Sequence, residues 1–251
     1  MDKSLTSRLH RFAAARVSPE EQFGLHLTVG VLVMLLAMAG FARIAGAVVN
    51  GAPITQLDVE LAHWLHAHAH QSLILRNFMM GITHLHSTPG MLTLTALAGW
   101  WLYSRGARHW IPTLLVTVPG GMMLNVLMKH TFERARPHFD EPLLTLSTYS
   151  FPSGHALAAT VFYGFLACYL TRHARGPGRR AGIVLLACLM VALVAGSRLY
   201  LGAHYLSDVL AAMAEGCAWL SICVTGAATL RRRQAARARA HGAATNPNEE
   251  T

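Results

Sequence analysis

The sequence predicts an all-α protein that crosses a membrane several times. Of its 251 residues, 53% are hydrophobic and only 13% are charged, where a typical soluble domain has about 25% charged residues. Six apolar stretches approach the roughly 20 residues that a transmembrane helix requires. They span residues 25–41, 88–103, 110–128, 156–170, 181–195 and 205–230. We therefore expect a six-span domain over residues 23–230.

The distribution of positive charge predicts how these spans are oriented. The chain has a formal net charge of +9, and most of its Lys and Arg residues lie in the N-terminal tail and in segments 105–108, 172–180 and 231–239. With six spans, all four segments lie on one side. Because Lys and Arg are enriched in cytoplasmic loops, both termini are expected to be cytoplasmic, residues 1–22 as a basic tail and residues 231–251 as a basic, disordered one. Such basic segments suit anionic lipid headgroups rather than nucleic acid.

The segment between the first two expected spans, residues 52–86, is predicted to be helical without crossing the membrane. Ile54, Leu57, Leu61 and Leu65 recur at helical spacing, as in a helix that lies on a membrane surface. Residues 73–84 are apolar but short, which favours a second interfacial or re-entrant helix. The segment also holds six histidines (His63, His66, His68, His70, His84 and His86). Their spacing matches no closed set of metal ligands, so we interpret them as a polar interfacial face, with a metal site as the weaker alternative.

Three polar clusters flank the ends of the last four expected spans. They occupy residues 129–137, 152–155 and 197–208. The expected topology places all three on the membrane face opposite the termini. Residues far apart in the sequence are therefore expected to share one site.

Five residues of these clusters suit an anion with several oxygens. Lys129, Arg136 and Arg198 place three cations at the membrane boundary, where charge is unfavourable and usually functional. The planar fork of Arg fits phosphate oxygens. Ser153 and the backbone around Gly154 add neutral donors at a helix N-terminus. Any one cation alone could be a snorkelling interfacial residue, but the set predicts a pocket for a compact anion such as phosphate.

Three further residues of the clusters can react. His204 and Asp208 are four positions apart and share one helix face. A carboxylate that accepts from one imidazole nitrogen leaves the other free as a nucleophile or base. His155 is a second imidazole that can protonate a leaving oxygen. Alone, His204 and Asp208 could be a structural pair; the neighbouring cations favour catalysis.

Three other charged residues lie in or near the clusters. Glu133 and Arg134 are neighbours within the first cluster, and a local ion pair is expected. Glu215 follows Asp208 by seven residues, two turns along the same helix face. An intramembrane carboxylate is a candidate functional group, and a neutral, hydrogen-bonded structural Glu is the equal alternative.

The clusters resemble the three-part signature of the type 2 phosphatidic acid phosphatase family, the integral-membrane branch of a superfamily that includes bacterial acid phosphatases and vanadium haloperoxidases. Every signature position is matched in order, by Lys129-x6-Arg136-Pro137, Pro152-Ser153-Gly154-His155 and Ser197-Arg198-x5-His204-x3-Asp208. The resemblance implies the family's helical core over residues 23–230.

The resemblance also implies a lipid phosphate phosphatase that needs no metal or other cofactor. His204 would attack phosphorus to form a phosphohistidine, Asp208 would orient it, and His155 would protonate the leaving oxygen. The phosphoryl oxygens would be bound by the five anion-binding residues (Lys129, Arg136, Ser153, Gly154 and Arg198).

The signature residues are expected to recognise only the phosphate group. Three substrates therefore remain possible: undecaprenyl pyrophosphate, phosphatidic acid and phosphatidylglycerol phosphate. The expected location is a bacterial inner membrane with an outward-facing site. One alternative is a phosphotransferase of the same family that moves phosphate from a polyprenyl pyrophosphate to another lipid. Another is a catalytically silent lipid-binding membrane protein, which the complete set of reactive residues counts against.

Overall fold

The structure is a computed structural model that describes residues 25–69 and 71–245. The regular secondary structure of these residues is entirely helical, which confirms the expected all-α class. The helices are α2 (Leu25–Val49), α3 (Ile54–Ala69), α4 (Leu73–Leu85), α5 (Thr88–Ser104), α6 (Ile111–Phe132), α7 (Gly154–His173), α8 (Pro177–Tyr200) and α9 (Leu206–Thr245), with a short 3-10 helix at Arg108–Trp110. The expected N-terminal tail, residues 1–22, lies outside the described residues.

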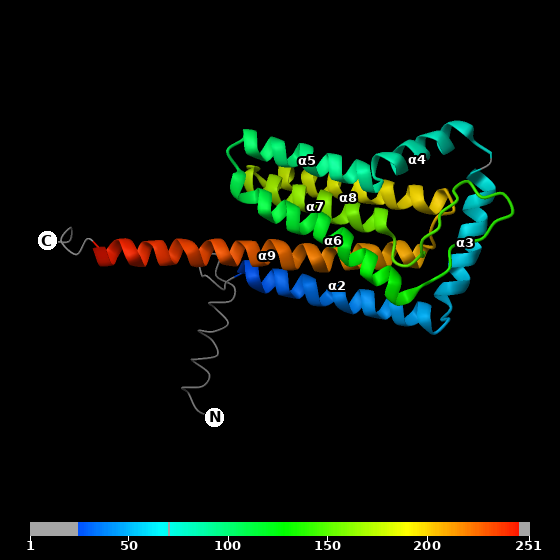
Figure 1. The fold of residues 1–251 in the computed structure, drawn as a ribbon, viewed down its shortest axis with the longest axis horizontal. Coiled ribbons are helices and arrows are strands. Elements are labelled where there is room, and N and C mark those ends of the chain that lie inside the picture. The colour runs from blue at the N-terminus through cyan, green and yellow to red at the C-terminus, as the bar shows by residue number, and fades with distance from the viewer. Residues whose placement is uncertain (1–24, 70, 246–251) are drawn as a thin grey trace, which may run out of the picture.

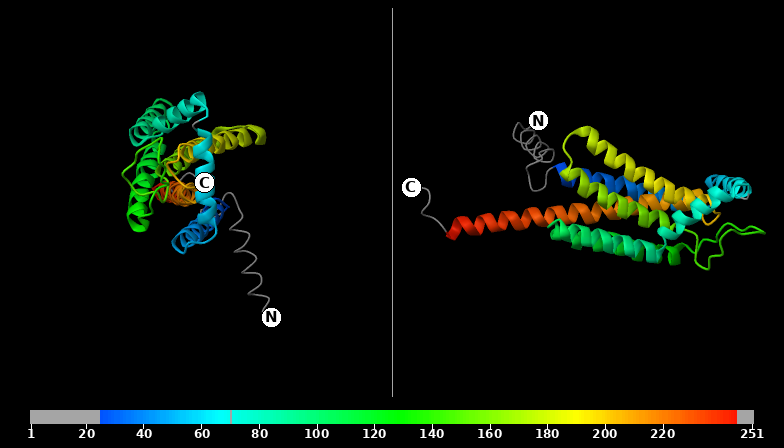
Figure 2. Two further views of the ribbon diagram at one scale, coloured as in Figure 1. Left: turned by 90° about the vertical axis from the view of Figure 1, so that its right-hand side faces the viewer. Right: turned by 90° about the horizontal axis from the view of Figure 1, so that it is seen from above.

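Helices α2 and α5 to α9 run along the long axis of the molecule and form the bundle (Figures 1 and 2). By length and composition, five segments of the described chain could cross a membrane: Leu27–Val49, Arg108–Phe132, Gly154–His173, Pro177–Tyr200 and Leu206–Ala238. Helix α5 corresponds to the remaining expected span, but it has 17 residues and is not among the five. The expected count of six spans is therefore not confirmed.

Helices α3 and α4 form the segment between α2 and α5, as expected. Figure 1 shows α3 lying across the end of the bundle and α4 leading from it toward α5. The apolar side chains of Leu57 and Trp64 point away from the protein and are about half exposed, whereas Asp58 is fully buried. The face of α3 that packs on the bundle therefore carries a carboxylate.

Helix α9 continues well beyond the last expected span and corrects the expectation of disorder from residue 231. It is helical to Thr245 and extends past the other helices (Figure 1). Residues 231–240 consist of Arg, Ala and Gln, which are among the strongest helix formers. Their lack of apolar anchors predicted disorder, but their intrinsic helix propensity favours continuation of the helix. Residues 246–251 lie outside the described residues.

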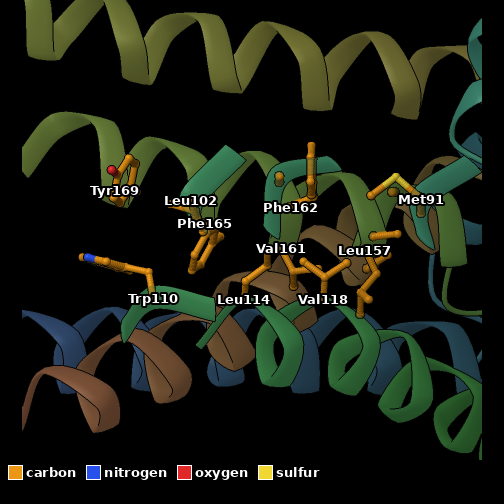
Figure 3. Close-up of a cluster of buried hydrophobic side chains, with 14 of the residues drawn as sticks. Met91, Leu102, Trp110, Leu114, Val118, Leu157, Val161, Phe162, Phe165 and Tyr169 are labelled. Atoms are coloured by element: carbon orange, nitrogen blue, oxygen red, sulfur yellow. The ribbon is translucent and has the colours of Figure 1, made fainter. Parts of the chain in front are cut away.

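The main apolar core lies between α5, α6 and α7, with side chains from α9 (Figure 3). At one end of this core, Trp110 packs edge-on against Phe165 and Tyr169. Small residues allow α9 to approach its neighbours closely, as is common among membrane helices. A Cβ atom on Gly216 would lie 2.9 Å from the Cβ of Thr160 on α7.

This close approach predicts that Gly216→Val destabilises the protein. The added side chain would overlap Thr160, and overpacking of this kind typically costs about 1–3 kcal/mol. We expect the thermal unfolding midpoint in detergent to fall by about 3–10 °C. Gly226→Val, also on α9 but with nothing within 4 Å of its added Cβ, is the matched control. Equal midpoints for the two variants would contradict the packing argument.

Candidate active site

The start of α7 brings the Pro152–His155 motif against the start of α9. Ser153 is the N-cap of α7, and its backbone N–H donates to the Asp208 carbonyl at 3.1 Å. A Cβ on Gly154 would lie 3.2 Å from the side-chain oxygen of Asn125 on α6, so glycine allows the close approach of α6. The motif is thus held against helices α6 and α9.

His204 lies in the turn between α8 and α9, with its two ring nitrogens facing different groups. Its Nδ1 is 3.5 Å from Oδ2 of Asp208, longer than an ordinary hydrogen bond. Its Nε2 is 3.3 Å from Nη1 of Arg136. Burial lowers the pKa of His204 to about 3, against the opposing effect of Asp208. The imidazole is therefore neutral at physiological pH, with Nε2 on the side of the cations.

The three expected cations are held by oxygen atoms that carry no full charge. Lys129 donates to the Tyr149 carbonyl at 2.5 Å. Arg136 donates to the carbonyls of Thr148 and Ala203, both at 2.6 Å, and Arg198 donates to the Thr83 hydroxyl at 3.2 Å. Among the described residues, none of the three forms an ion pair with a carboxylate. Their charge is left available to a bound anion.

These groups line one cavity of about 480 Å³. Six of the eight expected site residues contribute to its wall, namely Lys129, Arg136, Gly154, His155, Arg198 and His204. Ser153 and Asp208 are fully buried and do not contribute to the wall. Several buried polar atoms here have no hydrogen-bond partner in the described chain: Ser153 Oγ, His155 Nε2, Arg198 Nε and His204 Nδ1. Such a concentration of unsatisfied polar atoms is typical of a ligand site.

The rest of the cavity wall is largely apolar. It extends along α5 and α6 through Leu92, Pro119, Met122, Met123 and Val126. Leu92, Met123 and Val126 are 46%, 74% and 55% exposed, so this arm reaches the outer surface of the bundle. The cavity therefore joins a cationic end to an apolar side that faces the surroundings of the helices.

Sequence reasoning missed the residues that hold Asp208. We expected an ion pair between Arg134 and its neighbour Glu133, but Arg134 pairs with other residues. Its Nη1 lies 2.6 Å from Oδ1 of Asp208 and its Nη2 lies 2.8 Å from Oδ2 of Asp58, while Glu133 accepts a hydrogen bond from the Tyr149 hydroxyl. Ser150 also donates to Asp208. No periodicity or spacing in the sequence links Asp58 to these residues.

Of the remaining candidates, His86 joins the cavity wall, whereas Glu215, His63 and His66 do not. Glu215 is buried and accepts a hydrogen bond from the amide of Asn125, a residue of the cavity wall, at 3.1 Å. His63 and His66 pack against Phe139, His66 in a stacked arrangement with ring centroids 3.9 Å apart. Within the described ranges, no group of three or more His, Cys, Asp or Glu is placed to share a metal ion.

Comparisons with known proteins identify relatives with a named activity. A profile of the PAP2 superfamily matches residues 110–232. Phosphatidylglycerophosphatase B of Bacillus subtilis (strain 168) is 35% identical over 146 residues, which cover 57% of this chain and 70% of that protein. The crystal structure of a transmembrane PAP2-type phosphatidylglycerolphosphate phosphatase from Bacillus subtilis superimposes with a TM-score of 0.67 at 28% identity, covering 76% of this chain and 94% of the other.

The apolar helices and the similarity to a transmembrane relative indicate an integral membrane protein. The profile covers the region that holds all three polar clusters, and the similarity extends over more than two thirds of the curated relative. The chain therefore belongs to the PAP2 superfamily, as a member of the type 2 phosphatidic acid phosphatase family.

Proposed function

We propose that the protein is a membrane phosphatase that hydrolyses a lipid phosphate. The observation that carries this proposal is the lining of the 480 Å³ cavity, which combines three cations and three imidazoles (His86, His155 and His204) with an arm of apolar side chains. A lipid phosphate has the same two parts, a multiply charged headgroup and long apolar chains. The cations and N–H donors would hold the phosphoryl oxygens, and the apolar arm would hold the first part of the chains.

In the proposed reaction, Nε2 of neutral His204 attacks phosphorus and the bond from phosphorus to the leaving oxygen breaks. Protonated His155 gives its proton to that oxygen and becomes neutral, so the lipid leaves as an alcohol. A water then attacks the phosphohistidine, gives its proton to His155, and releases inorganic phosphate and free His204. Asp208 orients His204, while Lys129, Arg136, Arg198, Ser153 and Gly154 stabilise the charge that develops on the phosphoryl oxygens.

Among the three open substrates, the relatives favour phosphatidylglycerol phosphate. Both the curated relative and the solved structure carry the name of a phosphatase for this lipid. The site itself recognises the phosphate, so phosphatidic acid and undecaprenyl pyrophosphate are the comparison substrates. Absence of phosphate release from a polyprenyl pyrophosphate, with transfer of the phosphoryl group to an added acceptor lipid, would instead support a phosphotransferase.

We propose that the site faces outward from a bacterial inner membrane and that both termini are cytoplasmic. The charge distribution supports this orientation. Arg172 and Arg231 lie 5.3 and 4.7 Å from the ring of Trp110, at the end of the bundle remote from the cavity. Basic side chains at this end of the bundle suit the anionic lipid headgroups of the inner leaflet.

The first prediction concerns the proposed reactive residues. Purified protein in detergent with EDTA is expected to release phosphate from phosphatidylglycerol phosphate, and His204→Ala should abolish release because the nucleophile is lost. His155→Ala should lower kcat by about 10²–10⁴-fold, and Arg136→Ala or Arg198→Ala by about 10²–10³-fold. His84→Ala, an exposed histidine on α4, serves as the control and should keep full activity. Equal release by the wild type and His204→Ala would falsify the proposal, and loss of activity in EDTA would contradict metal independence.

The second prediction concerns pH. Only neutral His204 can attack phosphorus, and burial lowers the pKa of this group. Its imidazole therefore stays neutral as the pH falls through the ordinary value of about 6.5. We expect kcat at saturating substrate to retain more than half of its maximum at pH 6. Loss of half of kcat as the pH is lowered to 6.5 would show that His204 is not shielded as described.

The third prediction concerns orientation. In a variant without the native cysteines, Thr145→Cys places a thiol on the exposed loop beside the cavity, and Arg175→Cys places one in the loop between α7 and α8. In intact cells, a membrane-impermeant maleimide is expected to label the first and to label the second only after lysis. The reverse pattern would place the site on the cytoplasmic side.

A further inference from the structure

Asp58 is a fully buried carboxylate that the proposed reaction does not use. It lies on α3, 149 positions before Ser207, whose backbone N–H donates to its Oδ1 at 2.9 Å. Its Oδ2 accepts from the Ser207 hydroxyl at 2.5 Å and from Nη2 of Arg134 at 2.8 Å. Asp58 therefore caps the first turn of α9 from another helix. A carboxylate is favoured in this position because it faces the positive end of the helix dipole.

Arg134 connects this carboxylate to Asp208. Its Nη1 is 2.6 Å from Oδ1 of Asp208 and its Nη2 contacts Asp58. The guanidinium carbon lies 4.4 Å from the ring of Tyr205, which restrains the plane of the fork. Both carboxylates are 0% exposed, so a single cation compensates two buried anions. Only the planar fork of Arg can reach two carboxylates in fixed directions; the point charge of Lys cannot.

The two oxygens of Asp208 are held by different donors. Oδ1 is held by Arg134, and Oδ2 accepts from the Tyr205 backbone N–H at 2.9 Å and from the Ser150 hydroxyl. Oδ2 is also the oxygen nearest to Nδ1 of His204. The direction in which Asp208 presents Oδ2 to His204 is therefore set by groups other than His204. Arg134 is the charged member of that set.

We propose that Arg134 and Asp58 are positioning residues of the active site: Arg134 fixes the carboxylate of Asp208 against His204, and Asp58 fixes Arg134 and the first turn of α9. The inference rests on the proposed function, because it acts through His204 as the nucleophile. It makes α3, which lies across the end of the bundle (Figure 1), part of the catalytic unit.

The two residues have distinct effects on Asp208. Without Arg134, two buried carboxylates lose their shared cation, and Asp208 loses the donor that orients Oδ1. Without the charge of Asp58, the guanidinium has Asp208 as its only carboxylate partner and is drawn toward it. Either change moves Asp208 relative to His204, while Lys129, Arg136 and Arg198 keep their own contacts. The defect is therefore expected in the rate of reaction and not in the binding of phosphate.

The test uses Asp58→Asn, Arg134→Lys and the double variant, with Glu60→Gln as the matched control. Glu60 is an exposed acidic residue on the same helix. For each purified protein, kcat and KM for phosphatidylglycerol phosphate are measured together with the inhibition constant of inorganic phosphate. We expect kcat to fall by about 10–100-fold in both single variants, with KM and the inhibition constant within about twofold of the wild type. The kcat of the double variant should be no lower than that of the slower single variant, because both residues act through the same series of contacts to Asp208.

Several results would overturn the inference. The inference fails if kcat is unchanged in either single variant. It also fails if the fold decrease in kcat of the double variant equals the product of the two single decreases. A parallel loss of phosphate inhibition would indicate a merely structural role, because the cation pocket would have collapsed as well. If Arg134→Lys does not fold, Ser207→Ala removes one hydroxyl and no charge, and it should lower kcat by a smaller factor at unchanged KM. If the wild type releases phosphate and His204→Ala does not, the proposed function stands whatever the Asp58, Arg134 and Ser207 variants show. If the wild type releases no phosphate, both the proposed function and this inference fail.

Discussion

Compensation of buried charge at one end of an apolar bundle is the constraint on which the rest of this structure depends. Asp58 and Asp208 are fully buried and Arg198 is 2% exposed, and an unpaired buried charge is strongly unfavourable. The described chain meets this constraint in two ways. The carboxylates share Arg134, whereas the cations at the cavity are held by carbonyls and hydroxyls. Because those oxygens carry only partial charge, the cavity keeps a net positive potential for an anion.

The same compensation holds the loop between α6 and α7, which has no regular secondary structure. The carbonyl of Tyr149 accepts from both Lys129 and Arg136, and that of Thr148 accepts from Arg136. The N–H of Ser150 donates to the carbonyl of Arg134 at 2.8 Å, which closes the loop on itself. The loop is therefore ordered by the side chains that the proposed substrate would contact, and its shape and the charge of the cavity depend on each other.

The sequence predicted most helices and six residues of the cavity wall, because both depend on local signals. Apolar length marks the helices, and the signature residues are fixed at helix ends by short spacings. The residues it missed depend on contacts between distant segments. Glu133 adopts a left-handed conformation with φ of 46° where α6 ends. That turn separates Arg134 from its neighbour, so the expectation of a local ion pair failed. Asp58 carried no signal in the sequence, yet packing against the start of α9 buries it.

The N-termini of α7 and α9 lie side by side, joined by the hydrogen bond from the Ser153 N–H to the Asp208 carbonyl. Each helix presents a positive dipole end that favours an anion. At α9 this end is occupied by the carboxylates of Asp208 and Asp58. At α7 the first turn contains no acidic residue, and His155 and Gly154 face the cavity. One helix terminus is thus neutralised internally, which fixes the proposed nucleophile, while the other is left open in the place where the proposed substrate phosphate would bind.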